Sequence, residues 1–122
     1  MRKFMNKVLI VLIALVSLPS FAGVDVISAI YNNSTKKIEA QLQFGGCGTP
    51  KFKIEWDRGC YETIPLQADG QVVQIAGDDG CERLNQKTVA FTLQGNPCGT
   101  GHHLINLKGK GSNNDSIQVE VN

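Results

Sequence analysis

The chain has 122 residues, of which 42% are hydrophobic and 19% are charged, and its formal net charge is +1. Three of its twelve basic residues lie within the first 22 positions, so the remaining chain carries nine basic against eleven acidic residues, a net charge of −2. A nucleic-acid-binding domain usually has a strongly basic face, so this charge argues against nucleic acid as a partner. The hundred residues that follow position 22 suffice for one domain with one hydrophobic core.

Residues 1–22 have the order of a secretory signal peptide. Basic residues within the first seven positions precede an unbroken apolar run over residues 8–16, and Pro19 and the small residues Ser20 and Ala22 follow. The apolar run is about half of the roughly 20 residues that a membrane span needs. We therefore expect cleavage after Ala22 and no membrane insertion afterwards, with residues 23–122 forming a single exported domain.

Short alternating runs separated by Gly, Asn, Asp and Pro dominate residues 23–122, which is the pattern of an all-β domain. The first predicted strand is 24–31, and the clearest is 38–44, in which every second residue is apolar. Residues 52–56 alternate in the same way. Trp56 continues the apolar face of this strand, so we predict a core tryptophan in preference to a glycan-binding surface.

Residues 61–76 allow two interpretations. Asp69-Gly70 is a strong signal for a two-residue hairpin, and the alternative is one long strand that runs through Gly70. Residues 81–86 are predicted as one helical turn. Further strands are predicted at 88–93, 104–107 and 117–121.

Together these elements predict an all-β fold, a small antiparallel two-sheet sandwich with two disulfides, in which each sheet buries its alternating face against the other. A small barrel is the alternative.

The four cysteines, an even number in an exported chain, predict two disulfides, and no C-x-x-C pair suggests a metal site instead. Cys47 and Cys60 flank one predicted strand, which spans roughly 20 Å, whereas bridged Cα atoms lie roughly 4.4–6.8 Å apart. The same reasoning excludes Cys81–Cys98. A long strand over 61–76 would pair Cys47 with Cys81 and Cys60 with Cys98, whereas a hairpin there would pair Cys47 with Cys98 and Cys60 with Cys81.

Four segments of the chain resemble a set of small exported bacterial β domains. They are Gly45-Gly46-Cys47-Gly48 with the preceding Phe44, the aromatic strand that ends in Trp56-Asp57, the step Glu62-Thr63-Ile64-Pro65, and the turn Asp79-Gly80-Cys81-Glu82. The chain departs from the shared pattern at Thr63, where serine is usual, and matches little after Gln94. The resemblance implies an exported β domain and favours the pair Cys47–Cys81, hence the long strand, but it implies no activity.

Histidine is the usual acid–base group at neutral pH, and the only two histidines are the adjacent His102 and His103. If both lie in a strand they point to opposite faces, so they cannot act together on one substrate or share one metal. We expect both to lie exposed at the start of a strand. We expect no enzyme activity, no cofactor and no metal.

Two acidic groups are candidate sites. Asp78, Asp79 and Glu82 could hold calcium, but their spacing does not fit an EF-hand loop, and solvated turn carboxylates are commoner. Glycoside cleavage by two of the carboxylates of Glu55, Asp57 and Glu62 would need a substrate cleft, which a domain this small is not expected to form.

The loops are the more favourable places for binding, because loops on a rigid sandwich commonly carry function. The two glycine-rich loops, 95–101 and 108–114, and the position directly after the first of them supply the candidate binding residues, which are Asn96, Thr100, His102 and Asn113. We expect a periplasmic or secreted, non-enzymatic binding or inhibitor-like domain with a protein or glycan partner. The alternatives are a structural or assembly component of the envelope or surface, and a small secreted hydrolase.

Overall fold

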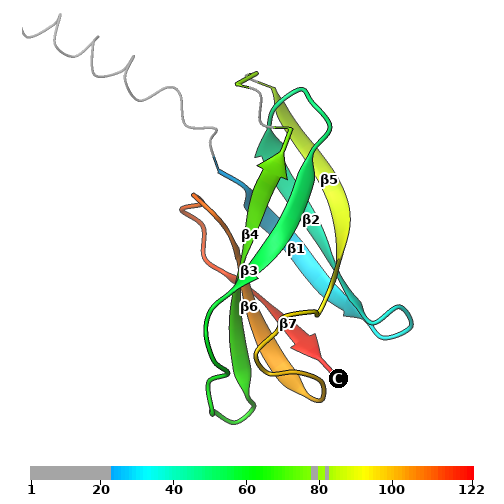
Figure 1. The fold of residues 1–122 in the computed structure, drawn as a ribbon, viewed down its shortest axis with the longest axis vertical. Helices are drawn as coiled ribbons and strands as arrows, with labels where there is room; N and C mark the ends of the chain where they lie inside the picture. The colour runs from blue at the N-terminus through cyan, green and yellow to red at the C-terminus, as the bar shows by residue number, and fades with distance from the viewer. Residues whose placement is uncertain (1–22, 78–79, 82) are drawn as a thin grey trace, which may run out of the picture.

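The computed structural model describes residues 23–77, 80–81 and 83–122, which form seven strands in two sheets that pack face to face (Figure 1). The predicted signal peptide lies outside the described residues. One sheet has three strands in the order β1-β2-β5, namely β1 (Asp25–Asn32), β2 (Lys37–Gly45) and β5 (Leu84–Thr92). The other has four in the order β3-β4-β6-β7, namely β3 (Lys51–Trp56), β4 (Gln67–Ala76), β6 (His103–Gly109) and β7 (Ile117–Val121).

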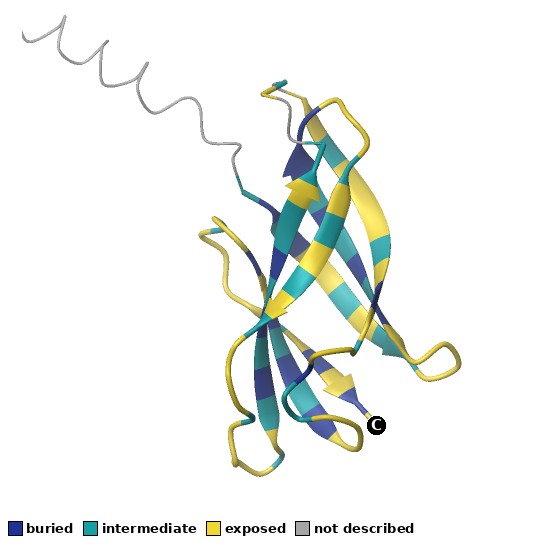
Figure 2. Ribbon diagram, in the orientation of Figure 1, coloured by how far each residue is buried: buried dark blue, intermediate teal, exposed yellow. Residues whose placement is uncertain are grey.

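Alternation within the strands builds the core. In β2 the residues at every second position from Ile38 to Phe44 are buried, and β6 buries His103, Ile105 and Leu107 in the same way. Figure 2 shows this alternation of buried and exposed residues along the strands. Across the two sheets, the rings of Phe44 and Phe52 meet edge to face with their centroids 4.9 Å apart. The predicted all-β two-sheet sandwich is therefore confirmed.

The segment around Asp69-Gly70 does not form a hairpin, because β4 runs through both residues as one strand. After β4 the chain crosses to the other sheet as β5 and returns as β6, which starts at the same end as β4. The pair β4–β6 is consequently parallel, whereas the other four strand pairs are antiparallel. The expectation of a purely antiparallel sandwich is wrong at this one pair.

One local prediction also needs correction. The helical turn predicted over 81–86 is wrong, because β5 begins at Leu84, and none of the described residues is helical. With no helix in this part of the chain, none of it forms a helical membrane span. In the first strand, a register shift between Val26 and Ser28 turns the chain so that Val26 and Ala29 both face the core.

Both disulfides have the partners that the long-strand interpretation predicted. Cys47 pairs with Cys81 and Cys60 with Cys98, with Cα–Cα distances of 5.6 and 4.9 Å, and no cysteine among the described residues is free. The bridges lie at opposite ends of the sandwich, because the strand β3 separates Cys47 from Cys60. Two disulfides are typical of a chain that folds in an oxidising, exported environment.

The two long sides of the sandwich differ. On one side β1 approaches β6 and β7 closely, and Val24 N–H donates to the Lys110 carbonyl at 3.0 Å. On the other side the edge strands β3 and β5 lie further apart, and each pairs with one neighbour only. We call these the closed side and the open side.

Candidate functional site

The four predicted binding residues do not come together. Asn96, Thr100 and His102 lie at one end of the sandwich, near the start of β6 and the end of β7. Asn113 lies in the connection 110–116, at the other end, because β6 and β7 are antiparallel. A single site can therefore include three of the four at most.

The disulfide Cys60–Cys98 ties together two loops at the end that holds Asn96, Thr100 and His102. One loop, residues 57–66, follows β3, and the other, residues 93–102, follows β5 in the opposite sheet. Both hang from the same end of the sandwich (Figure 1). We call this region the bridged end.

The side chain of Trp56 packs against the second loop. Its side chain is half-buried against the core, as predicted, and its Nε1–H donates to the Gln94 carbonyl at 3.1 Å. Gly95 has a φ of 85°, and a Cβ there would lie 3.2 Å from Trp56 Cδ1. The loop thus lies directly on the indole, which leaves Trp56 in a structural role.

Asn96 is buried and is not a presented binding residue, which corrects the prediction. Its Oδ1 accepts from the Cys98 N–H at 3.0 Å, so its Nδ2 faces His103 Nε2 at 2.7 Å. An asparagine whose side chain replaces turn hydrogen bonds in this way is a structural element of the loop. Asn96 thereby couples the bridged cysteine to the first residue of β6.

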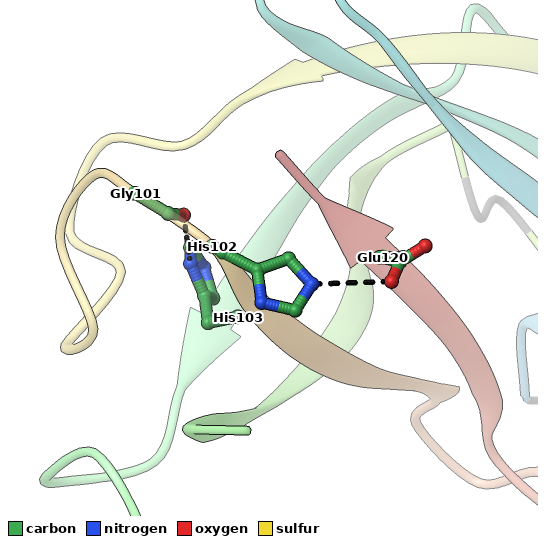
Figure 3. Close-up of polar contacts among 4 residues, drawn as sticks. All are labelled: Gly101, His102, His103 and Glu120. Carbon is green, nitrogen blue, oxygen red and sulfur yellow. Dashed lines mark hydrogen bonds and ion pairs between the residues drawn. The ribbon is translucent and has the colours of Figure 1, made fainter. Parts of the chain in front are cut away.

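His103 is fully buried, so the expectation that both histidines are exposed is wrong for this residue. Its Nδ1 lies 2.8 Å from the Gly101 carbonyl oxygen (Figure 3), which can only accept a hydrogen bond. The proton therefore sits on Nδ1, and Nε2 accepts from Asn96. With both ring nitrogens engaged, His103 has no lone pair left for a substrate or a metal.

His102 points away from the core, so the two histidines do face opposite sides of the sheet, as predicted. Its Nε2 lies 3.1 Å from Glu120 Oε2 on β7 (Figure 3). Both side chains are more than half exposed, and such surface pairs add little to stability. Thr100, two residues before His102 in the chain, is exposed as well. Of the predicted binding residues, Thr100 and His102 are therefore the two that the bridged end presents to solvent.

No group of three or more His, Cys, Asp or Glu residues that could hold a metal occurs among the described residues. The predicted acidic cluster of Asp78, Asp79 and Glu82 lies outside them. Glu55, one of the three carboxylates considered for glycoside cleavage, lies 3.5 Å from Lys53 Nζ in an exposed ion pair.

The most exposed apolar side chains at the bridged end belong to residues 61–66, which form a loop and not the first part of the strand predicted over 61–76. Ile64 is fully exposed, at 101%, and Tyr61 and Leu66 are exposed at 49% and 40%. The exposed face of this loop is therefore mostly apolar, although Glu62 and Thr63 are also exposed.

Backbone hydrogen bonds close the base of the 61–66 loop. Tyr61 N–H donates to the Gln67 carbonyl at 2.8 Å, and Gln67 N–H donates to the Tyr61 carbonyl at 3.1 Å. Within the loop, Thr63 Oγ1 donates to the Pro65 carbonyl at 2.8 Å. Together with the disulfide at Cys60, these bonds hold three apolar side chains out from the sandwich.

A sequence signal for this loop existed. Pro65 has no N–H to donate to a strand ladder, so proline is confined to strand edges and loops, and it follows directly on Ile64. Alternation alone could not show that Ile64 and Leu66 face solvent.

The fold and the bridged end define a disulfide-linked β-sandwich that presents an apolar loop. No protein-family model, curated protein or solved structure matches the chain.

Proposed function

We propose that the protein is an exported, non-enzymatic binding domain, inhibitor-like in that it presents a pre-formed loop, and that it works in the periplasm or after release from the cell. The observation that carries the proposal is the 61–66 loop, which exposes Tyr61, Ile64 and Leu66 at the bridged end. The proposed contact surface is this loop together with the neighbouring Thr100 and His102.

The chemistry of the loop favours a protein partner over a glycan. Aliphatic side chains such as Ile64 and Leu66 gain by entering an apolar pocket, whereas glycan sites rely on aromatic faces and polar groups. Tyr61 adds a ring with a hydroxyl, a side chain that is enriched in the energetic centres of protein interfaces.

Attachment at its base lowers the cost of binding through this loop. Ordering a flexible segment on binding costs conformational entropy. Here the Cys60–Cys98 bridge and the paired bonds between Tyr61 and Gln67 already fix both ends of the loop. Much of the conformational entropy of the loop is therefore already lost on folding, before the loop contacts a partner.

The test is a comparison of captures by three forms of the oxidised mature domain. Wild type, Ile64→Asp and Ile30→Asp are immobilised and exposed to envelope extract and to culture medium of the source cells. Ile30 is the matched control, because it is 63% exposed on β1, in the sheet opposite to the one whose strands flank the loop. Both substitutions put a charge where an exposed isoleucine stood.

We expect a protein that wild type and Ile30→Asp retain and that Ile64→Asp loses. Retention by all three forms would contradict a contact through the loop. Self-association of the purified domain without any partner, seen by size-exclusion chromatography, would favour the assembly component over the binding domain.

A further inference from the structure

A groove runs along β5 on the open side. It consists of two adjoining hollows of about 300 and 480 Å³, which share Pro50 and Lys87 in their walls. The first hollow has Phe44 and Asn85 in its wall, and the second has Phe52 and Val89. We call this the edge groove.

The edge groove lies against a strand that has a free edge. β5 pairs with β2 on one side, and it is the last strand of its sheet. Arg83, directly before β5, and the β5 residues 85–90 line the groove over about 25 Å of extended chain. An edge of this length is a template for one more strand.

Lys87 occupies a position where the strand pattern calls for an apolar residue. It pairs with Leu42, a fully buried core residue, so its side chain leaves the backbone on the core-facing side of β5. It is nevertheless exposed, because the open side admits solvent there. A lysine that points inward on an edge strand is a device against pairing with a second copy of the same edge.

The charge of the edge groove has one sign among the described residues that line it. Lys51, Arg83 and Lys87 line it, and none of its described lining residues carries a carboxylate. The mature chain as a whole carries more acidic than basic residues. The groove is thus a local cationic strip whose walls also contain apolar residues, among them Phe44, Phe52 and Val89.

We propose that the edge groove binds an extended segment of a partner protein as an additional strand on β5, with a carboxylate of that segment opposite Lys87. Main-chain hydrogen bonds to an exposed edge supply affinity in this mode of recognition, and alternate side chains supply specificity. Residues two positions before and after the acidic one face the same side. They would meet the walls at Phe44 and at Phe52, so the pattern recognised is apolar–x–acidic–x–apolar.

This inference goes beyond the 61–66 loop. Asn85, Lys87 and Val89 lie in the part of β5 that starts near Cys81, whereas the loop lies at the bridged end. The groove can bind a strand whether or not the loop binds a partner, and loss of one contact leaves the other intact.

A display library of random nine-residue peptides, selected on the oxidised mature domain, tests the proposal without knowledge of the partner. Recovered peptides are then measured by fluorescence polarisation on wild type, Lys87→Glu and Lys108→Glu. Lys108 is the matched control, because it is an exposed lysine on β6 of the other sheet, outside the edge groove. Amide shifts in NMR spectra locate the binding site.

We expect the recovered peptides to share a central Asp or Glu between apolar residues and to shift the amides of residues 83–90. Lys87→Glu should weaken binding about tenfold, because an opposite-charge cross-strand pair becomes a like-charge pair, and replacing the acidic residue of the peptide by lysine should restore it. Lys108→Glu should bind as wild type does.

Three results would overturn the proposal: no peptide is recovered, the recovered peptides lack an acidic residue, or they bind Lys87→Glu as tightly as wild type. Dimerisation of the wild-type domain through β5 would also overturn it, because the occupant would then be a second copy. We also expect Ile64→Asp to bind the recovered peptides as tightly as wild type does. Peptide binding at the edge groove is then independent of the 61–66 loop, and failure of one proposal can be told from failure of the other.

Discussion

The closed and the open side of the sandwich solve the same problem in opposite ways. On each side, the edge strands of the two sheets have outer backbone groups that need either hydrogen-bond partners or water. On the closed side, Gly109 of β6 lies against the Val24 carbonyl, and Val24 N–H bonds to the Lys110 carbonyl. On the open side, β3 and β5 remain apart, and Lys51 and Lys87 line the hollow between them.

The closed side depends on the absence of a side chain at Gly109, and the open side depends on the charge of Lys87. Gly109 permits an approach that no other residue would. Lys87 is compatible with the open side because its ammonium group reaches water. Substitutions on the two sides should therefore differ in both the size and the kind of their effect.

The largest effect is expected at Gly109. Its φ is not in the left-handed region, so Gly109→Ala leaves the backbone conformation allowed, but the new Cβ would overlap the Val24 carbonyl oxygen and lie 3.2 Å from Asp25 Cα. Because backbone atoms cannot move aside as a side chain can, we expect the free energy of unfolding to fall by about 3 kcal/mol or more. Urea denaturation of the oxidised domain measures this.

The control for Gly109 is Gly59→Ala. Gly59 has a φ of 79° with open space around its Cβ position, so the cost there is backbone strain alone, about 1 kcal/mol. Equal losses for the two variants would show that the closed side is not closed by a tight approach.

An intermediate effect is expected at Phe52 on the open side. Phe52→Ala removes a half-buried ring that packs edge-on against Phe44, 4.9 Å away. The full cost of a buried Phe→Ala change is about 3–5 kcal/mol, and with the ring half-exposed to the open side we expect about 2 kcal/mol. Lys53→Ala, an exposed neighbour on the same strand, should cost less than about 0.5 kcal/mol. A Phe52 variant as costly as Gly109→Ala would mean that the open side is packed like the closed one.

The smallest effect on stability, and a different kind of effect, is expected at Lys87. Lys87→Val should change the free energy of unfolding by no more than about 0.5 kcal/mol, because the side chain is exposed. It removes the charge from the β5 edge, however, and should make the domain self-associate with rising concentration. Sedimentation velocity measures this, with Lys108→Val as the control. A Lys87→Val domain that stays monomeric would refute the role of this lysine on the open side.

The sequence predicted local structure better than it predicted the arrangement of distant parts. The alternation over 38–44 and 52–56 identified the buried faces, because period-two patterns report directly on which side of a sheet is covered. The reach of one strand excluded two disulfide pairings. The parallel pair β4–β6 could not be predicted in this way, because it depends on which sheet β5 joins.

The candidate site was predicted less well, for a physical reason. Asn96 and His103 have polar side chains, but their hydrogen bonds to each other and to Cys98 N–H let both be buried. Ile64 and Leu66 are apolar but face solvent, because Pro65 and the tie at Cys60 place them in a loop. Polarity alone predicts that Asn96 and His103 are exposed and that Ile64 and Leu66 are buried. Their tertiary contacts produce the opposite arrangement.

The order of the disulfides along the chain has a consequence for its covalent connectivity. The bridges Cys47–Cys81 and Cys60–Cys98 interleave, because Cys60 lies between Cys47 and Cys81 in the chain and Cys81 lies between Cys60 and Cys98. A single peptide bond cut anywhere between Cys47 and Cys98 therefore leaves the two pieces joined by at least one bridge. A cut within residues 61–66 leaves them joined by both. A protease that severed the exposed loop would still face one covalently continuous molecule, with the new chain ends held at the place where the loop had been.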